Sequence, residues 1–195
     1  MAVENTVYYL PGFGGQLHTG LGEGLTSRGF RVAGRETRDD FKRMPFQDQI
    51  DTVATDLKEH FWRKDALVVV NSFGGYLFLH AQAQMSPYPG KVLLLSPIVG
   101  DFQNEEIRMG FIPPRAEVLL ELAQTGRFPC PLQAEIHVGS EDWQSHPTNV
   151  TAFGRAVGIR VEVLPGGGHM LGKEYVGGVL DRWLPSSSVA GSSLQ

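Results

Sequence analysis

A serine follows an apolar, β-branched run in the segment 68–75, which reads Val-Val-Val-Asn-Ser-Phe-Gly-Gly and leads into a helical pattern. A sharp turn between a strand and a helix exposes a serine hydroxyl, and it requires small neighbours because the two elements approach closely. Gly74 is one such neighbour, whereas Val70 stands where the usual G-x-S-x-G pattern has a glycine. This motif predicts that Ser72 is a nucleophile, provided that a base and an acid accompany it.

An aspartate and a histidine follow two later strand-like runs. Asp142 comes soon after the run 134–138, and His169 ends the glycine-rich loop after the run 160–164. A nucleophilic serine needs a histidine to accept its proton and an acid to orient that histidine. Because the carboxyl ends of parallel strands meet at one edge of a sheet, the order Ser72, Asp142, His169 predicts a catalytic triad.

Backbone N–H groups for a developing oxyanion are predicted at two places. In acyl transfer, one donor follows the nucleophile and the other comes from an early glycine-rich loop. Phe73 follows the serine, and the loop 11–15, Pro-Gly-Phe-Gly-Gly, follows the first strand-like run. Glycines let such a loop approach a ligand closely. We expect the N–H groups of Phe73 and Phe13 to form the oxyanion hole, with Gly14 as the next choice.

The same loop has a competing interpretation. Gly12 and Gly14 after a strand, with Glu36 near the end of the next one, match part of the dinucleotide-binding fingerprint G-x-G-x-x-G. Leu17 stands where the third glycine belongs. Because an isolated G-x-G is a weak signal, the sequence favours a role of this loop in acyl transfer by a serine nucleophile over dinucleotide binding.

Strand-like runs alternate with helical patterns along the chain. This alternation indicates a parallel sheet with right-handed crossovers, and continuous apolar strands indicate that helices cover both faces. We therefore predict the α/β class, a three-layer α/β/α sandwich with a mostly parallel six-stranded sheet. The predicted strands span residues 6–10, 30–33, 66–71, 91–96, 134–139 and 160–164.

The segment 46–61 has apolar residues at helical spacing and predicts a helix with one buried face. These residues are expected in the core and not around a cofactor. They are Phe46, Ile50, Val53, Ala54, Leu57 and Phe61.

Taken together, these motifs resemble the α/β-hydrolase superfamily, in particular its small serine esterases with little or no lid, such as those similar to retinoblastoma-binding protein 9 and the YqiA-type bacterial esterases. The resemblance covers residues 6–184 and depends on the elbow 71–76, the strand end 95–97, the acid loop 139–142 and the histidine loop 167–169. It implies a minimal hydrolase fold with strand order 2-1-3-4-5-6. It also implies hydrolysis of a carboxylic ester or thioester without a metal or an organic cofactor.

Length and composition predict one domain. A chain of 195 residues with 42% hydrophobic content can bury a substantial core. We expect a single α/β-hydrolase domain at 1–184 and a flexible, serine-rich tail at 185–195. A net charge of -4 without a basic run disfavours nucleic acid as a partner.

The sequence also indicates where the protein acts. We expect no membrane partner because no segment has the apolar length of a membrane span. The expected location is cytoplasmic, because the start lacks a signal peptide and the single cysteine allows no intrachain disulfide. The predicted partner is a small-molecule acyl substrate, and the chain is expected to be a monomer or a weak homodimer.

Substrate contacts are predicted in loops beyond the strand ends. The segment 98–114 occupies the position where larger hydrolases insert a lid; its apolar side chains either line an acyl pocket or pack under a connecting loop. We place His18, Met109, Phe111 and Trp143 at the substrate, which suggests a modest apolar acyl group.

Other reactive side chains give weaker signals. The charged loop 35–43 either reaches the rim of the site or is simply solvated, and we favour the second interpretation. Cys130 precedes a strand, at the sheet end opposite the site, and is expected to be a poor nucleophile. The histidines lack zinc-type spacing such as H-E-x-x-H. We predict no metal site.

The sequence therefore predicts a serine hydrolase that forms an acyl-enzyme with a small to medium acyl group. Glu141 and then Asp101 are the alternative acids. Two further functions stay open on the same fold. One is a non-catalytic binding protein, which Val70 and Pro11 keep open because they depart from the family pattern. The other is a lyase or a carbon–carbon bond hydrolase with the same triad.

Overall fold

The structure is a computed structural model in which residues 5–104 and 109–185 are described. The predicted tail, 185–195, lies outside the described residues apart from Pro185.

Six strands form the central sheet, and all five strand pairs in it are parallel. The strands lie in the order β2-β1-β3-β4-β7-β8. Numbered among themselves along the chain, they read 2-1-3-4-5-6, as predicted, and their bounds differ from the predicted ones by at most one residue. The bounds are Thr6–Leu10 for β1, Arg31–Gly34 for β2, Leu67–Asn71 for β3, Lys91–Leu95 for β4, Gln133–Gly139 for β7 and Arg160–Leu164 for β8.

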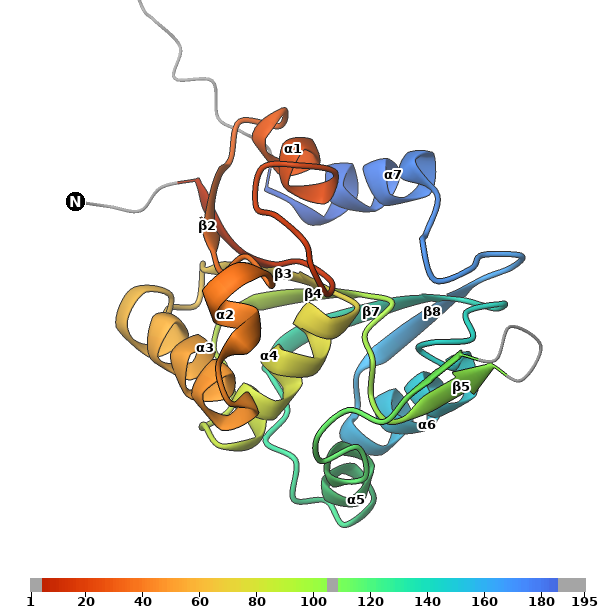
Figure 1. The fold of residues 1–195 in the computed structure, drawn as a ribbon. Coiled ribbons are helices and arrows are strands. Elements are labelled where there is room, and N and C mark those ends of the chain that lie inside the picture. Colours follow the sequence, from red (N-terminus) through yellow and green to blue (C-terminus); the bar gives the residue numbers. More distant parts are fainter. Residues whose placement is uncertain (1–4, 105–108, 186–195) are drawn as a thin grey trace, which may run out of the picture.

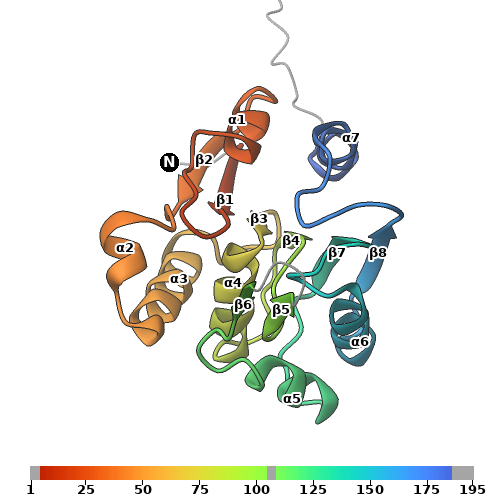
Figure 2. The same ribbon diagram turned by 45° about the vertical axis from the view of Figure 1, so that its right-hand side comes forward.

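Helices cover both faces of this sheet and confirm the predicted three-layer sandwich (Figure 1). The helices α1 (Leu21–Thr26) and α7 (Lys173–Trp183) lie on one face. The other face carries α3 (Phe46–His60), α4 (Phe73–Ala83) and α6 (Pro147–Val157). The short helices α2 and α5 lie on this second side as well (Figure 2); they span Asp39–Arg43 and Val118–Gln124.

The buried side chains of each strand belong alternately to the cores on the two sides of the sheet, because successive side chains of a strand point to opposite faces. In β1, Val7 and Tyr9 pack under α1 and α7, whereas Tyr8 and Leu10 pack under α3 and α4. The predicted apolar face of α3 is confirmed, since five of its six residues are buried and Phe46 packs partly buried against them.

A small hairpin follows β4 where the sequence predicted only a connecting loop. Its strands are β5 (Phe102–Asn104) and β6 (Met109–Phe111), which pair antiparallel. Beyond the hairpin, the Tyr76 hydroxyl donates a hydrogen bond of 2.7 Å to the carbonyl of Pro114. This bond ties the inserted segment to α4, the helix that begins at the predicted nucleophile.

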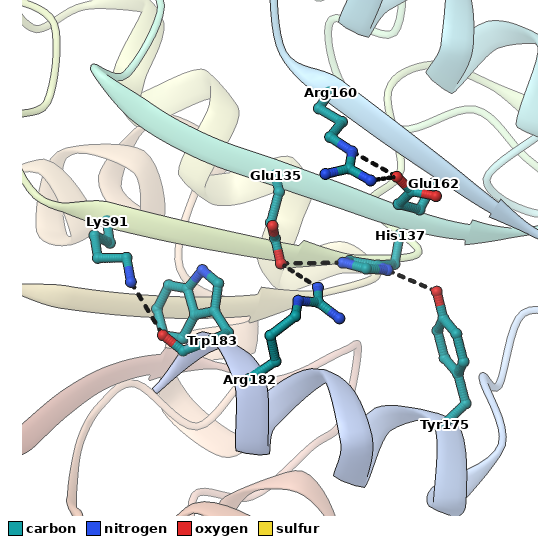
Figure 3. A network of polar contacts seen from close by, with 8 residues as sticks. All are labelled: Lys91, Glu135, His137, Arg160, Glu162, Tyr175, Arg182 and Trp183. Atoms are coloured by element: carbon teal, nitrogen blue, oxygen red, sulfur yellow. Dashed lines mark hydrogen bonds and ion pairs between the residues drawn. The ribbon is translucent and has the colours of Figure 1, made fainter. Parts of the chain in front are cut away.

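A polar network fixes α7 to β7 (Figure 3). The Nδ1 atom of His137, in β7, lies 2.7 Å from the Tyr175 hydroxyl, in the first turn of α7. Glu135 Oε1 lies 3.2 Å from His137 Nε2 and accepts a hydrogen bond of 3.1 Å from Arg182 near the other end of α7. Because α7 follows the loop that carries His169, this network holds one end of that loop in place.

Candidate active site

Ser72 occupies a strained turn between β3 and α4. Its dihedrals are φ 51° and ψ −121°, a region that residues other than glycine rarely adopt and that clusters at functional sites. The turn requires glycine at position 74, because a Cβ there would lie 2.2 Å from the Leu10 carbonyl oxygen. Val70 is fully buried in the core, and its Cγ2 atom would lie 3.8 Å from a Cβ at Gly75, so the valine that departs from the usual motif packs against the start of α4 without a clash.

The structure brings Ser72, His169 and Asp142 together in one hydrogen-bonded chain. Ser72 Oγ lies 2.7 Å from His169 Nε2. On the other side of the ring, His169 Nδ1 lies 2.9 Å from Asp142 Oδ1 and 3.1 Å from Oδ2. These distances suit proton transfer from the serine hydroxyl to an imidazole that a carboxylate orients.

Asp142 is buried and held as a carboxylate. Its Oδ1 atom accepts hydrogen bonds from the backbone N–H groups of Gln144, at 3.0 Å, and Ser145, at 2.9 Å. Burial raises the pKa of Asp142, but the hydrogen bonds from His169 and the Ser145 N–H outweigh it, so this pKa lies below its ordinary value. The acid therefore stays charged next to the imidazole.

Short contacts also join the loops that carry the acid and the histidine. The N–H of Glu141 donates to the Gly167 carbonyl at 2.8 Å, and a Cβ at Gly139 would lie 2.0 Å from that same oxygen. Ser145 Oγ donates to the Ser96 carbonyl at 2.7 Å and lies 3.4 Å from His169 Nδ1. Sequence reasoning missed Ser145, because a serine in a polar loop gives no signal of its own.

The glycine-rich loop after β1 lies against the nucleophile. A Cβ at Gly12 would be 3.2 Å from Ser72 Cβ and 3.6 Å from Ser72 Oγ. The Gly12 N–H donates to Asn71 Oδ1 at 3.1 Å, so the residue before the serine holds the loop. The edge of the Phe13 ring meets the Phe73 ring, with 5.6 Å between their centroids.

Hydrogen bonds within this loop distinguish its N–H groups and correct one prediction. The Gly14 N–H donates to the Thr37 carbonyl at 2.9 Å, so it is not free to bind an oxyanion as proposed from the sequence. The Gly15 N–H donates to the Gly12 carbonyl, also at 2.9 Å. Within the described part of the chain, the Phe13 N–H has no hydrogen-bond partner.

Aromatic side chains surround the acid loop. The ring of Phe102, in the hairpin, lies 5.6 Å from Phe111 and 5.6 Å from Trp143, centroid to centroid. Phe111 and Trp143 thus form one cluster beside Asp142, whereas the side chain of Met109 lies outside what the structure describes. His18 is exposed, and among the residues that the structure describes no hydrogen bond or ion pair joins it to the triad.

Two apolar side chains next to the triad are largely exposed. Phe13 is 59% exposed, and Met170, which follows His169, is 83% exposed. Met170 was not among the predicted substrate residues, because a single methionine in a loop has no pattern around it. Both side chains are available to an apolar group bound near the serine.

Neither alternative acid is placed to serve His169. Glu141 and Asp101 are exposed, and across residues 5–104 and 109–185 neither side chain bonds to the imidazole. Cys130 is half-buried, and burial raises the pKa of its thiol, as suits a poor nucleophile.

Metal-binding clusters and membrane-spanning helices are both absent from the described residues. In the described part of the chain, no three histidine, cysteine, aspartate or glutamate side chains gather closely enough to hold a metal ion. Among the same residues, every helix is too short or too polar to cross a membrane.

Comparison with known proteins identifies the fold. No family model and no curated protein sequence matches the chain. Among solved structures, it is similar to a lipase-esterase related protein from Clostridium acetobutylicum, with a TM-score of 0.64, 13% identity, and coverage of 92% of this chain and 94% of the other. It is also similar to a monoacylglycerol lipase from Paleococcus ferrophilus, with a TM-score of 0.63, 13% identity, and coverage of 91% of this chain and 93% of the other.

A third similar structure is the ydeN gene product from B. subtilis, with a TM-score of 0.62, 13% identity, and coverage of 91% of this chain and 97% of the other. Solved α/β hydrolases thus match nearly the whole chain in structure. The chain has the α/β-hydrolase fold.

Proposed function

We propose that this chain is a serine hydrolase that cleaves a carboxylic ester or thioester with a small to medium acyl group. The observation that carries the proposal is the hydrogen-bonded chain from Ser72 Oγ through His169 to buried Asp142. Ser72 stands at a strained turn on a hydrolase fold, and such strain is a feature of functional positions. The solved structures named as lipase and lipase-esterase related protein support the same class.

In this proposal, Ser72 Oγ attacks the acyl carbonyl carbon while its proton passes to His169 Nε2. Asp142 holds the Nδ1–H tautomer and stabilises the imidazolium that forms. The negative charge on the carbonyl oxygen is stabilised by the N–H groups of Phe73 and Phe13. Phe73 is the first residue of α4, so its N–H has no partner inside the helix.

The proton on His169 then passes to the leaving alkoxide or thiolate, and an acyl-serine remains. A water molecule gives a proton to His169 and attacks the acyl carbon; His169 then returns this proton to Ser72 Oγ as the bond between Oγ and the acyl carbon breaks, which releases the carboxylic acid. The apolar Phe13 and Met170 and the Phe102, Phe111 and Trp143 cluster favour an apolar acyl group.

A fluorophosphonate probe tests this proposal without a choice of substrate. Such a probe phosphonylates an activated serine, so intact mass should show one adduct per chain on the wild type. Ser72→Ala should show none, and Ser27→Ala, which replaces an exposed serine that bonds only within its helix end, should label like the wild type.

Each other outcome points to a different function. A folded wild type without an adduct would contradict the proposal and favour a binding protein. Labelling of Ser72 without turnover of p-nitrophenyl esters or acyl thioesters would favour a lyase or a carbon–carbon bond hydrolase on the same triad.

A further inference from the structure

Thr37 is the residue around which the glycine-rich loop is built. It lies between β2 and α2 and is 1% exposed. Its carbonyl accepts the Gly14 N–H at 2.9 Å, and its N–H donates to the Gly15 carbonyl at 3.2 Å. Its hydroxyl accepts the Gly15 N–H at 3.0 Å and donates a short hydrogen bond to the Gly12 carbonyl. One buried threonine thus makes four hydrogen bonds to three glycines.

The segment that carries Thr37 is itself anchored. Arg35 forms a two-pronged ion pair with Asp56 in α3, with Nε to Oδ2 at 2.7 Å and Nη2 to Oδ1 at 2.6 Å. Asp56 also accepts the Tyr8 hydroxyl at 2.9 Å. Next to Thr37, Glu36 accepts the N–H of Leu17 at 3.2 Å. The charged loop 35–43, for which the sequence favoured simple solvation, therefore helps to hold the glycine-rich loop in place.

The hydrogen bonds of Thr37 fix the backbone around Phe13. Three glycines give the loop 12–15 many backbone conformations, and Thr37 bonds to the residues on both sides of Phe13. With the neighbouring N–H groups engaged, the Phe13 N–H alone in this loop has no partner among the residues described. Donors that are fixed before the reaction stabilise an oxyanion best, because nothing has to reorganise as the charge develops.

We propose that Thr37 is a positioning residue, which acts through its hydroxyl to hold the Phe13 N–H toward the oxyanion. This inference rests on the proposed function. It assigns to Thr37 a contribution that appears in the transition state and not in the binding of substrate, because the oxyanion forms only as Ser72 attacks.

Thr37→Val tests this proposal, because valine matches threonine in shape but lacks both hydroxyl bonds. Thr37→Ser keeps the hydroxyl. Thr6→Val is the matched control: Thr6 is buried at the start of β1, and within the described residues its hydroxyl has no hydrogen-bond partner. The readouts are kcat and KM for p-nitrophenyl acetate and Kd for an alkyl boronic acid, which mimics the tetrahedral intermediate, and for the carboxylate product.

We expect Thr37→Val to lower kcat by about 10- to 100-fold, less than the roughly 10²- to 10³-fold loss of an oxyanion donor itself. KM and product binding should stay within about twofold, while boronic acid binding weakens in parallel with kcat. Thr37→Ser and Thr6→Val should resemble the wild type.

Equal losses in Thr37→Val and Thr37→Ser, or a loss of product binding that matches the loss of boronic acid binding, would overturn the inference. So would an unchanged kcat in Thr37→Val. If Thr37→Val does not fold, Thr37→Ser becomes the deciding variant. It keeps the hydroxyl, so a loss of turnover in Thr37→Ser would contradict a role for that hydroxyl. These results are separate from a failure of the proposed function, in which the wild type itself would leave Ser72 unlabelled by fluorophosphonate.

Discussion

Acid should destabilise this protein through His80, a buried histidine in α4. This residue is 4% exposed. Its ring packs edge-on against the rings of Tyr76 and Phe46, and its centroid lies 4.4 Å from that of Tyr76 and 5.3 Å from that of Phe46. Among the described residues, its Nε2 atom has no hydrogen-bond partner. Burial, together with the charge of Arg115, lowers the pKa of His80 from 6.5 to about 4. The unfolded chain therefore binds a proton at a pH where the folded protein does not.

The size of this effect follows from proton linkage. Since the unfolded state binds more protons below pH 6.5, the free energy of unfolding falls as the pH falls from 6.5 toward 4. At about 1.36 kcal/mol per pKa unit, the full loss is about 3 kcal/mol. Most of it, about 2 to 3 kcal/mol, should be lost between pH 7.5 and pH 4.5.

Urea unfolding of the wild type and His80→Phe at the two pH values measures this loss. Phenylalanine fills a similar space and does not titrate, so the variant should gain about 2 to 3 kcal/mol of unfolding free energy relative to the wild type when the pH is lowered to 4.5. The comparison removes contributions from other titrating groups because both proteins share them. A difference between the proteins that stays constant with pH would refute the reasoning, and His80→Leu should give the same trend if phenylalanine is too large.

Three further substitutions test the site and the turn. Asp142→Asn should lower kcat by about 10³- to 10⁴-fold with little change in melting temperature, because the amide oxygen still accepts the loop N–H groups but the imidazole loses its charged partner; retained turnover would refute the assignment of the acid. Gly12→Ala should lower kcat at least about tenfold, because the new Cβ would lie 3.2 Å from Ser72 Cβ, closer than an ordinary contact; steady-state kinetics decide, and an unchanged kcat would show that the new methyl group does not displace Ser72. Gly74→Ala should destabilise the fold by about 3 kcal/mol, because its Cβ would lie 2.2 Å from a backbone oxygen of β1. Gly178→Ala is the control and should not destabilise the fold, because the space around its Cβ is open. Equal melting temperatures of the two variants would contradict the packing argument.

The sheet was predictable because its central strands β1, β3 and β4 are mostly apolar runs, and polar or glycine-rich loops separate the strands. The alternation of strands and helices indicated the layers, and the resemblance to hydrolases supplied the strand order. The hairpin was not predictable, because each of its strands has only three residues, too few to show alternation. The sequence thus predicted the elements that are long enough to show a pattern of apolar residues.

The three residues of the candidate triad were predictable from their order at successive strand ends, and the structure places them within hydrogen-bonding distance. Their supports were not. Thr37 and Ser145 act through hydrogen bonds to residues distant in sequence, and neither belongs to a motif. The choice between Phe13 and Gly14 also needed the structure, because only the hydrogen bond of Gly14 to Thr37 distinguishes two N–H groups in one loop.

The central claim is that Ser72 forms an acyl-enzyme, and rapid mixing with p-nitrophenyl acetate tests it most directly. The account predicts a burst of p-nitrophenol that approaches one equivalent per chain, with the acetyl group recovered on the peptide that contains Ser72 after acid quenching. Ser72→Ala should show neither the burst nor the modified peptide. Steady turnover by the wild type with no acetyl group on Ser72, or an equal burst from Ser72→Ala, would contradict the account.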